Sequence, residues 1–472
     1  MSGAAQTATP RTAPELVAPA PFASSGPFGG VDDPLSRIHT LVADIDALLS
    51  RQLDAILHHP KLQRLEALWR NTAWLVERTR TARTLRVEIL NGRWAEIARD
   101  LERAATFDSS ALYDKVYSQA LGMPGGEPFG LIVIDHAIAH RPGEAQTFDD
   151  TTVAERLAEI GGAAFCPFVL GVDPRMLQME SFEDIDLRQD LSGTFRGREY
   201  DRFKRLRKLP DARFLACTMP RMLVRAPHRG RSFGRLAFRY DERIERHGDL
   251  LWGSSAFALA DAALRAMAHH RWPAAIRGVS EPDAGGLVSG PAHILLPGDR
   301  RGVVARFPTE NAVSETQEVE LNALGLTALR QCHLTGSAAF FNVPSLHEPQ
   351  PAPGLSSIDA RMGGMINYIL CVSRFAHHIK AMTREWIGSF ATAEAAERKL
   401  RDWIGKYIDG SAGSDEQSRA RYPLREATVG VIEDPASPGN FHATVALRPH
   451  FQLDQSNADF VFTTPIGKPV KA

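Results

Sequence analysis

The sequence predicts an α/β protein of the mixed α+β kind, in which a body of mixed sheets and helices is followed by a C-terminal β-hairpin. Three observations predict it. Apolar residues recur at helical spacing in several segments, and short apolar strands alternate with these helices in βαβ fashion. Near the C-terminus the apolar period becomes two, which is typical of strands. We therefore expect four parts, which are an Ala/Pro/Gly-rich disordered arm (1–30), a helical hairpin (31–80), an α/β body (81–410) and a C-terminal strand segment (411–472).

The composition is that of an ordinary globular protein. Of the 472 residues 44% are hydrophobic, and 55 Lys and Arg stand against 56 Asp and Glu, which gives a formal charge of −1. A nearly neutral chain has no bulk field to hold nucleic acid or an anionic membrane. No apolar run approaches the roughly 20 residues that cross a bilayer. We therefore expect no nucleic-acid partner and no membrane partner.

The four cysteines are far apart and lie in apolar surroundings, at Cys166, Cys217, Cys332 and Cys371. They form no CxxC pair and no Cys/His ligand spacing, so the sequence predicts buried thiols rather than a disulfide framework or a zinc site. Buried free thiols suit a reducing compartment, and the cytosol fits best.

Two helices follow the N-terminal arm. Leu53 and Leu57 belong to the apolar positions of the first, and Leu65 and Trp69 to those of the second. The residues between them, His58-His59-Pro60, predict a turn, because proline does not continue a helix. The sequence therefore predicts a helical hairpin.

The body alternates short strands with helices. We expect strands at residues 85–90, 130–134, 165–170, 213–219 and 338–343, and helices at 94–105, 152–160, 255–270 and 315–324. The longest helix is expected to begin near Ser356, with an apolar face that runs from Met362 to Trp386. A basic stripe is expected on another face of this helix, at Arg374, His377, Lys380 and Arg384. A last helix is expected at about residues 391–407.

The C-terminal segment has the pattern of a hairpin. Val429 and Val431 alternate with small or polar neighbours, and Ala443, Val445 and Leu447 alternate on the return strand, beyond a turn at residues 435–440. A third short alternation contains Phe460 and Phe462. An isolated hairpin is only marginally stable in water, so we expect this segment to pair with strands of another chain.

A search for catalytic and ligand-binding motifs finds none. The sequence has no Walker loop, dinucleotide GxGxxG, GxSxG elbow or HExxH. The pair His136 and His140 lacks a third ligand at the expected spacing. A hydrolase would need Asp135 and His136 to converge with the acidic run that comprises Glu180, Glu183, Asp184, Asp186 and Asp190. We assign no catalytic, cofactor-binding or metal-binding residue and expect a structural protein, not an enzyme.

Several stretches resemble one known family, and their number and order are specific. They include ALLSRQLDAILHHPKLQRLEALWR (47–70), LLWGSSAFALADA (250–262), PTENAVSETQEVELNALGLTAL (308–329) and YILCVSRFAHHIKAM (368–382). The chain resembles the large subunit of the type VI secretion contractile sheath, the TssC or VipB family, from about Ile45 to Leu453.

The resemblance implies a structural role and a set of partners. Such a protomer pairs with a small sheath subunit, polymerises as a helical tube around an inner tube in the bacterial cytoplasm, and contracts to propel that tube. The implied partners are the small subunit, the inner tube protein, the baseplate, further copies of the chain and a sheath-disassembling ATPase. No cofactor is implied.

Three sets of residues receive roles from the resemblance. The helical hairpin, with Leu53, Leu57, Leu65 and Trp69, is expected to pair with the small subunit. The hairpin residues Val429, Val431, Ala443, Val445 and Leu447 are expected to take part in strand exchange between subunits, and the basic stripe is expected to face the inner tube.

Two departures from the family pattern leave an alternative open. The arm at residues 1–30 is rich in proline and alanine and is poorly suited to donate a strand, and Asn457 and Asp459 interrupt the alternation near the C-terminus. A tail-assembly adaptor or scaffold that never polymerises is therefore the second hypothesis, ahead of a hydrolase.

Overall fold

The computed structural model covers residues 1–472, and the structure describes residues 34–466 apart from several gaps. These gaps are residues 81, 83, 124, 144–147, 188–189, 233–237, 280–284, 289–291, 293–308, 333–336, 350–362, 387–391, 412–415, 434–440 and 451–459. The predicted arm, the predicted helix start at Ser356 and the predicted hairpin turn lie outside the described residues.

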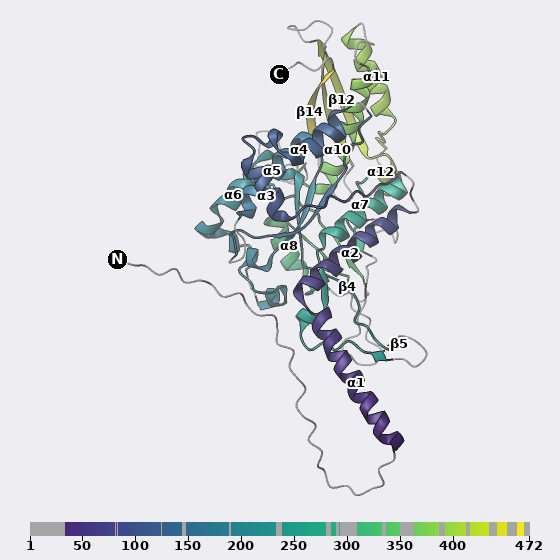
Figure 1. The fold of residues 1–472 in the computed structure, drawn as a ribbon. Helices are drawn as coiled ribbons and strands as arrows, with labels where there is room; N and C mark the ends of the chain where they lie inside the picture. The colour runs from purple at the N-terminus through teal and green to yellow at the C-terminus, as the bar shows by residue number, and fades with distance from the viewer. Residues whose placement is uncertain are drawn as a thin grey trace, which may run out of the picture.

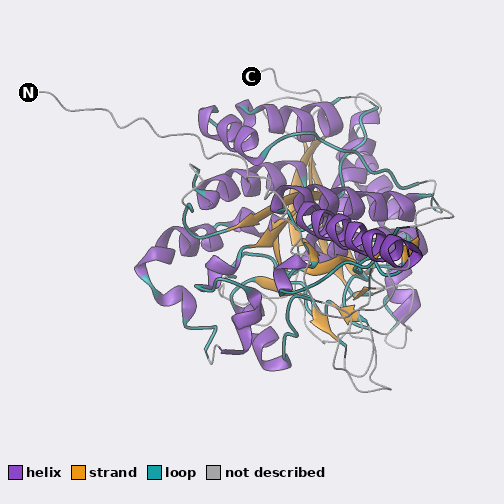
Figure 2. Cartoon of the chain, turned by 60° about the horizontal axis from the view of Figure 1, so that its bottom comes forward, coloured by secondary structure: helices purple, strands orange, loops and turns teal. Residues whose placement is uncertain are grey.

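A four-stranded parallel sheet forms the centre of the body, with strands β1 (Ile132–Ile138), β2 (Phe168–Val172), β3 (Leu215–Met219) and β9 (Leu326–Ala328) in that order. The connections contain helices, among them α5 (Asp150–Ala164), α6 (Asp201–Lys208) and α8 (Glu315–Ala323). Figure 2 shows the strands in the interior and most helices outside them. This arrangement confirms the mixed α/β class and the βαβ order that the sequence predicts.

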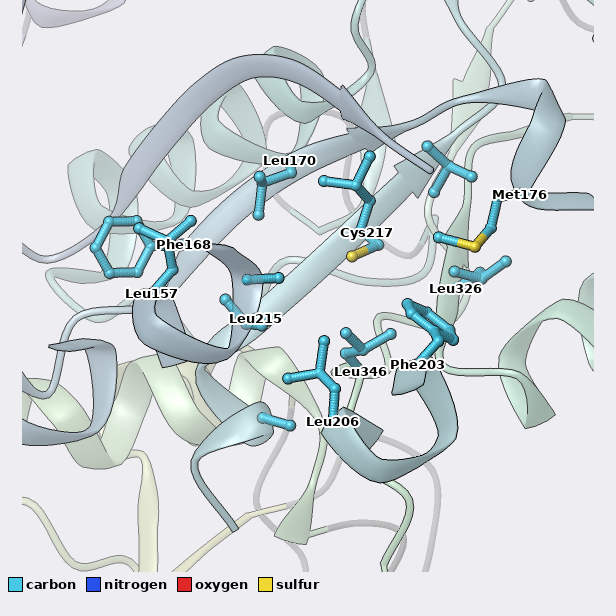
Figure 3. Packing of buried hydrophobic residues seen from close by; sticks show 14 of the residues in the cluster. Leu157, Phe168, Leu170, Met176, Phe203, Leu206, Leu215, Cys217, Leu326 and Leu346 are labelled. Atoms are coloured by element: carbon cyan, nitrogen blue, oxygen red, sulfur yellow. The ribbon is translucent and has the colours of Figure 1, made fainter. Parts of the chain in front are cut away.

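Alternating residues of the central strands enter two cores. Phe168 and Leu170 of β2 pack with Leu157 of α5 in one cluster, together with Leu215 and Cys217 of β3 (Figure 3). Val169 and Ala216 have the opposite parity and pack in a second cluster with α7 (Ala256–His270). Successive side chains of a strand point to opposite faces, so helices cover both faces of this sheet.

Smaller elements complete the body. The helices are α3 (Trp94–Arg103) and α4 (Ala111–Tyr113), which leads into a π-helix at Asp114–Gly122. The short strands are β4 (Met222–Arg225), β5 (Arg231–Ser232), β6 (Arg239–Tyr240), β7 (Leu251–Gly253), β8 (Leu287–Val288), β10 (Arg330–Gln331) and β11 (Ala338–Ala339). They pair as β4 with β7, β5 with β6, and β10-β11-β8.

Helices α1 (Pro34–Leu57) and α2 (Pro60–Thr79) confirm the break at His58-His59 but not the hairpin. α1 extends away from the body instead of folding back along α2 (Figure 1). α2 packs on the body through Ala67 and Leu75, which are buried. The prediction of a hairpin was wrong because a helix-breaking sequence determines where two helices separate but not the angle between them.

Three other expectations are corrected. Residues 85–90 belong to no helix or strand, with Ile89 and Leu90 more than half exposed, so alternation here was not sufficient for pairing. The helix expected to be longest, α10 (Ile366–Glu385), has 20 residues, whereas α1 has 24. Cys166, Cys217 and Cys371 are buried as predicted, and Cys332 is only half-buried.

The C-terminal region forms a three-stranded antiparallel sheet in the order β12 (Leu424–Glu433), β13 (Phe441–Pro449) and β14 (Phe460–Ile466). Its β12–β13 pair is the predicted hairpin. The third strand comes from the same chain, despite the interruption at Asn457 and Asp459. The sheet packs on α10 and α11 (Ala393–Gly405), and a short helix α12 (Glu416–Arg421), missed in the sequence, precedes it.

Candidate assembly surfaces

The first candidate surface is the apolar stripe of α1. No residue of α1 is buried, and the large apolar side chains at Leu35, Ile38, Val42, Ile45, Leu49 and Ile56 are between 41% and 63% exposed. The spacing between successive members of this set alternates between three and four residues when Gln52 is counted between Leu49 and Ile56. This is the spacing of a coiled-coil seam. We call these seven residues the α1 seam.

The α1 seam is wider than a single line of side chains. Leu41 and Leu48 lie one position before seam residues, and both are at least 40% exposed. Exposed apolar residues scattered singly are ordinary, but a contiguous stripe along a projecting helix marks a surface that another helix covers. The arrangement therefore suits docking of a partner helix along α1.

The predicted pairing residues divide into two pairs. Leu65 and Trp69 on α2 are more than half exposed and remain available to a partner. Leu53 and Leu57, at the C-terminal end of α1, are half-buried against the chain itself. The sequence prediction missed the first half of the α1 seam, although its three-four spacing was present in the sequence.

A charged cluster fixes the end of α1 to the body. Tyr240 donates a hydrogen bond to Oδ1 of Asp54 at 2.5 Å, and Nε2 of His58 lies 3.2 Å from Oε1 of Glu242. Arg225 donates to Glu242 at 2.6 Å and to Glu66 of α2 at 2.8 Å. These contacts tie α1 and α2 to β4 and β6, so they set the direction in which α1 projects.

Glu242 is the centre of this cluster. Its side chain is 1% exposed. Burial alone would raise the pKa of its carboxyl, but hydrogen bonds from Arg225 and from the His228 amide hold the pKa below the usual range. Glu242 is therefore charged at neutral pH and paired with Arg225.

The second candidate surface is the C-terminal sheet. Val431, Ala443, Val445 and Leu447 are buried against α10 and α11, and Val429 is half-buried in the same core. Tyr368 of α10 also donates a hydrogen bond to the carbonyl of Leu447 at 3.2 Å. The side chains of the predicted exchange residues thus hold the sheet on its own chain, and their part in strand exchange stays a prediction.

The basic stripe of α10 is not a solvent-facing stripe in this chain. His377 is 6% exposed, and its Nε2 lies 2.8 Å from the carbonyl oxygen of Ala164. The Arg374 guanidinium lies 5.5 Å from the centre of the Trp272 ring. Arg384 donates to the carbonyls of Leu121 and Met123. All three side chains are thus engaged within the chain, and contact of the basic stripe with an inner tube stays a prediction.

The remaining member of the stripe, Lys380, lies over two aromatic rings. Its Nζ is 4.7 Å from the centre of the Phe165 ring and 5.3 Å from that of Tyr117. Burial, together with the nearby positive charge of Arg384, lowers the pKa of Lys380 to about 8. The ammonium is therefore held within the chain by cation–π contacts.

The residues of the hydrolase hypothesis have structural roles. The carboxylate of Asp150, the first residue of α5, accepts hydrogen bonds from Trp94 and the Ala139 amide and lies 3.1 Å from Nε2 of His136. The His136 ring stacks on Trp94 with the ring centres 4.1 Å apart. Asp150 thus joins α3, β1 and α5.

The acidic run does not join this group. Asp135 is exposed on β1, and Glu183 lies on a short 3-10 helix at Phe182–Leu187, where it pairs with His247. Over the described ranges, no hydrogen bond or ion pair connects His136 to the run, and no three His, Cys, Asp or Glu residues are grouped as metal ligands. None of the described helices is long and apolar enough to cross a membrane.

Comparisons with known proteins identify the class of assembly. Residues 39–347 match the family described as EvpB/VC_A0108, tail sheath N-terminal domain, and residues 356–466 match the EvpB/VC_A0108 tail sheath gpW/gp25-like domain. The first match alone covers more than half of the chain. These matches define the class of protein, which is a tail sheath protein.

One curated relative extends this result. The chain is 33% identical over 430 residues to the type VI secretion system sheath protein TssC1 of Pseudomonas aeruginosa. The aligned region covers 90% of this chain and 84% of that protein. The chain belongs to the EvpB/VipB family of tail sheath proteins. It is a structural sheath subunit and not an enzyme, and the resemblance to the large subunit of type VI sheaths is confirmed.

Proposed function

We propose that this chain is the large subunit of a bacterial type VI secretion sheath, which pairs with a small sheath subunit and polymerises in the cytoplasm around an inner tube. Contraction of the polymer propels that tube. The baseplate and a sheath-disassembling ATPase are the further partners of this polymer. The relationship to TssC1 supports the assembly, and the α1 seam supports the pairing.

The α1 seam is the observation that carries the pairing with the small subunit. Its apolar side chains are about half exposed in the free chain. Covering the rest of each would contribute on the order of 1 kcal/mol per residue, and several such residues suffice for a stable helix–helix interface. Gln52, the polar member of the seam, would fix the register of the partner helix.

A substitution in the seam tests the pairing. Ile45→Asp places a carboxylate in the middle of the seam, where a partner helix would bury it. Burying an unpaired carboxylate costs several kcal/mol, so affinity for the small subunit is expected to fall by more than about 100-fold. The measurement is the affinity of the two purified subunits by titration calorimetry.

Ala47→Asp is the matched control, because Ala47 is exposed on α1 but lies outside the seam. It introduces the same charge on the same helix. Both variants should fold as the wild type, since neither position is buried. Equal binding by the two variants would show that the small subunit does not dock on the seam.

A further inference from the structure

His58 lies where the projecting helix α1 meets the body, and both nitrogens of its ring face carboxylates. Nε2 lies 3.2 Å from Oε1 of Glu242, and Nδ1 lies 3.9 Å from Oδ1 of Asp249. The side chains of these three residues are 15%, 1% and 8% exposed, so water screens the two contacts only weakly. The strength of both contacts therefore depends on the charge of the ring.

Only the protonated ring satisfies both carboxylates. A neutral imidazole donates from one nitrogen and presents a lone pair at the other, so one carboxylate would face that lone pair and repel it. The imidazolium donates from both nitrogens. His58 also follows directly after Leu57, the last residue of α1, and the carbonyls at a helix C-terminus attract a cation. The docked position of α1 therefore favours a protonated His58.

The direction of α1 rests on few contacts besides those of His58. No residue of α1 is buried, so its apolar side chains do not fix it to the body. Asp54 accepts from the hydroxyl of Tyr240 at 2.5 Å and from the amide of Arg243 at 3.3 Å. Gln63, at the start of α2, donates to the carbonyls of Gly248 and Asp249. Weakening the His58 contacts should therefore loosen α1.

Titratable and charged groups surround His58 on each neighbouring element. They are Asp54 on α1, His59, Lys61 and Glu66 around the start of α2, Arg225 on β4, His228 after it, Tyr240 on β6, and Glu242, Arg243, Glu245, Arg246, His247 and Asp249 before β7.

Two of these groups hold their charge where histidine titrates, which is between about pH 5 and pH 8. Burial and the carboxylate of Asp54 raise the pKa of Tyr240. Burial alone would raise the pKa of Glu242, but the hydrogen bond from Arg225 holds it below the usual range. His228, whose main-chain amide donates to Glu242, and His247, which pairs with Glu183, are nearby histidines and need their own controls.

We propose that His58 is a positioning residue, whose imidazolium holds α1 in its docked direction and whose loss of a proton releases the helix. The docked chain binds the proton more tightly than the released chain. Docking is therefore complete at low pH and is weakened as the pH rises. The consequence for pairing rests on the proposed function: a released α1 must be ordered again when the small subunit binds, which lowers affinity.

Hydrogen exchange of the free, full-length chain measures how often α1 leaves the body. The amides to follow are that of Arg243, which donates to Asp54, and that of His58, which donates to the carbonyl of Asp54. After correction for the intrinsic effect of pH on exchange, their protection is expected to fall by about tenfold from about pH 6 to about pH 8. This is the equivalent of one hydrogen bond to a charged group.

Asp249→Asn is the sharpest variant. Oδ2 of Asp249 accepts from the amides of Glu245 and Arg246 at 3.0 and 2.8 Å, so the amide oxygen of the variant must stay there. Its nitrogen then replaces Oδ1 and can donate to the lone pair of a neutral Nδ1 of His58. Protection should remain high at both pH values. A tenfold fall in this variant would show that the second carboxylate plays no part.

His58→Gln removes the titrating ring and has three matched controls. The variant carries no proton to lose and can donate to Glu242, so its protection should be low and equal at both pH values. His228→Gln, His247→Gln and His59→Gln should keep the fall seen in the wild type. A pH-dependent fall in His58→Gln, or its loss in one of the three controls alone, would overturn the assignment to His58.

Titration calorimetry with the small subunit connects the positioning to pairing. The affinity of the wild type is expected to be about tenfold lower at about pH 8 than at about pH 6, and that of Asp249→Asn equal at both. Equal affinities in the wild type beside pH-dependent exchange would overturn the link between α1 direction and pairing. Binding at neither pH would contradict the proposed function and leave the exchange result standing.

Discussion

At the scale of single residues, His377 shows how a polar side chain is used inside the chain. It is buried on α10 beside the carbonyl of Ala164, and burial lowers its pKa to about 4. The imidazole is therefore neutral in the folded chain at neutral pH. A histidine that stays neutral when folded and gains a proton when unfolded makes stability depend on pH.

The sign of this dependence follows from the two pKa values. The unfolded chain binds a proton at His377 below about pH 6.5, and the folded chain only below about 4. The free energy of unfolding should therefore fall as the pH drops from 6.5 to 4, by roughly 3 kcal/mol from this residue. His377→Gln should lose that part of the pH dependence in denaturant titrations. His39→Gln, which removes an exposed histidine of α1, should keep it; identical pH profiles for the two variants would contradict the assignment.

The same residue also shows a limit of sequence reasoning. Arg374, His377, Lys380 and Arg384 recur at helical spacing, which correctly places them along one helix. Spacing does not tell how much of the helix other segments cover. Here a carbonyl of α5 and the rings of Trp272 and Phe165 meet three of these side chains, and none of those contacts is visible in the local sequence.

At the scale of elements, the cluster around Glu242 governs the direction of α1. Glu242→Ala would leave the buried Arg225 with Glu66 as its remaining carboxylate partner and is expected to cost about 3–5 kcal/mol of stability. Thermal unfolding measures this loss. Glu245→Ala is the control, because Glu245 lies on the same segment and makes only an exposed ion pair with Arg243. Similar melting of both variants would show that the cluster does not anchor α1.

Local patterns predicted most elements but not their pairing. Three strands of the central sheet, β1, β2 and β3, and helices such as α7 follow from apolar period and length, whereas the short β9 was not predicted. Residues 85–90 have the same alternation but no ladder partner, and β14 forms although polar residues precede it. Pairing depends on a neighbour that is far away in the sequence, so alternation alone could not decide either case.

At the scale of the whole molecule, the two candidate surfaces lie at opposite ends. α1 projects from one end of the body, and the β12-β13-β14 sheet stands at the other (Figure 1). The parallel sheet and its helices lie between them and hold both in place. A subunit with two separate contact regions can bind a small subunit and a neighbouring protomer at the same time, which a helical polymer requires.

The sequence shows no site that would supply energy for contraction of such a polymer. No nucleotide-binding or catalytic motif occurs in the sequence. Contraction would then draw on the difference in free energy between the extended and contracted polymers.

Removal of residues after 421 would be a poor test of assembly, because β12 and β13 fill the core beside α10. Point variants that leave this core intact are a better test of assembly.

The most direct test of the sheath role is negative-stain electron microscopy of the chain co-expressed with the small sheath subunit, with Ile45→Asp as the control. Hollow helical tubes with the wild type, absent with Ile45→Asp, are the expected result. Discrete particles of finite size with the wild type would contradict a polymerising sheath subunit and would favour a tail-assembly adaptor instead.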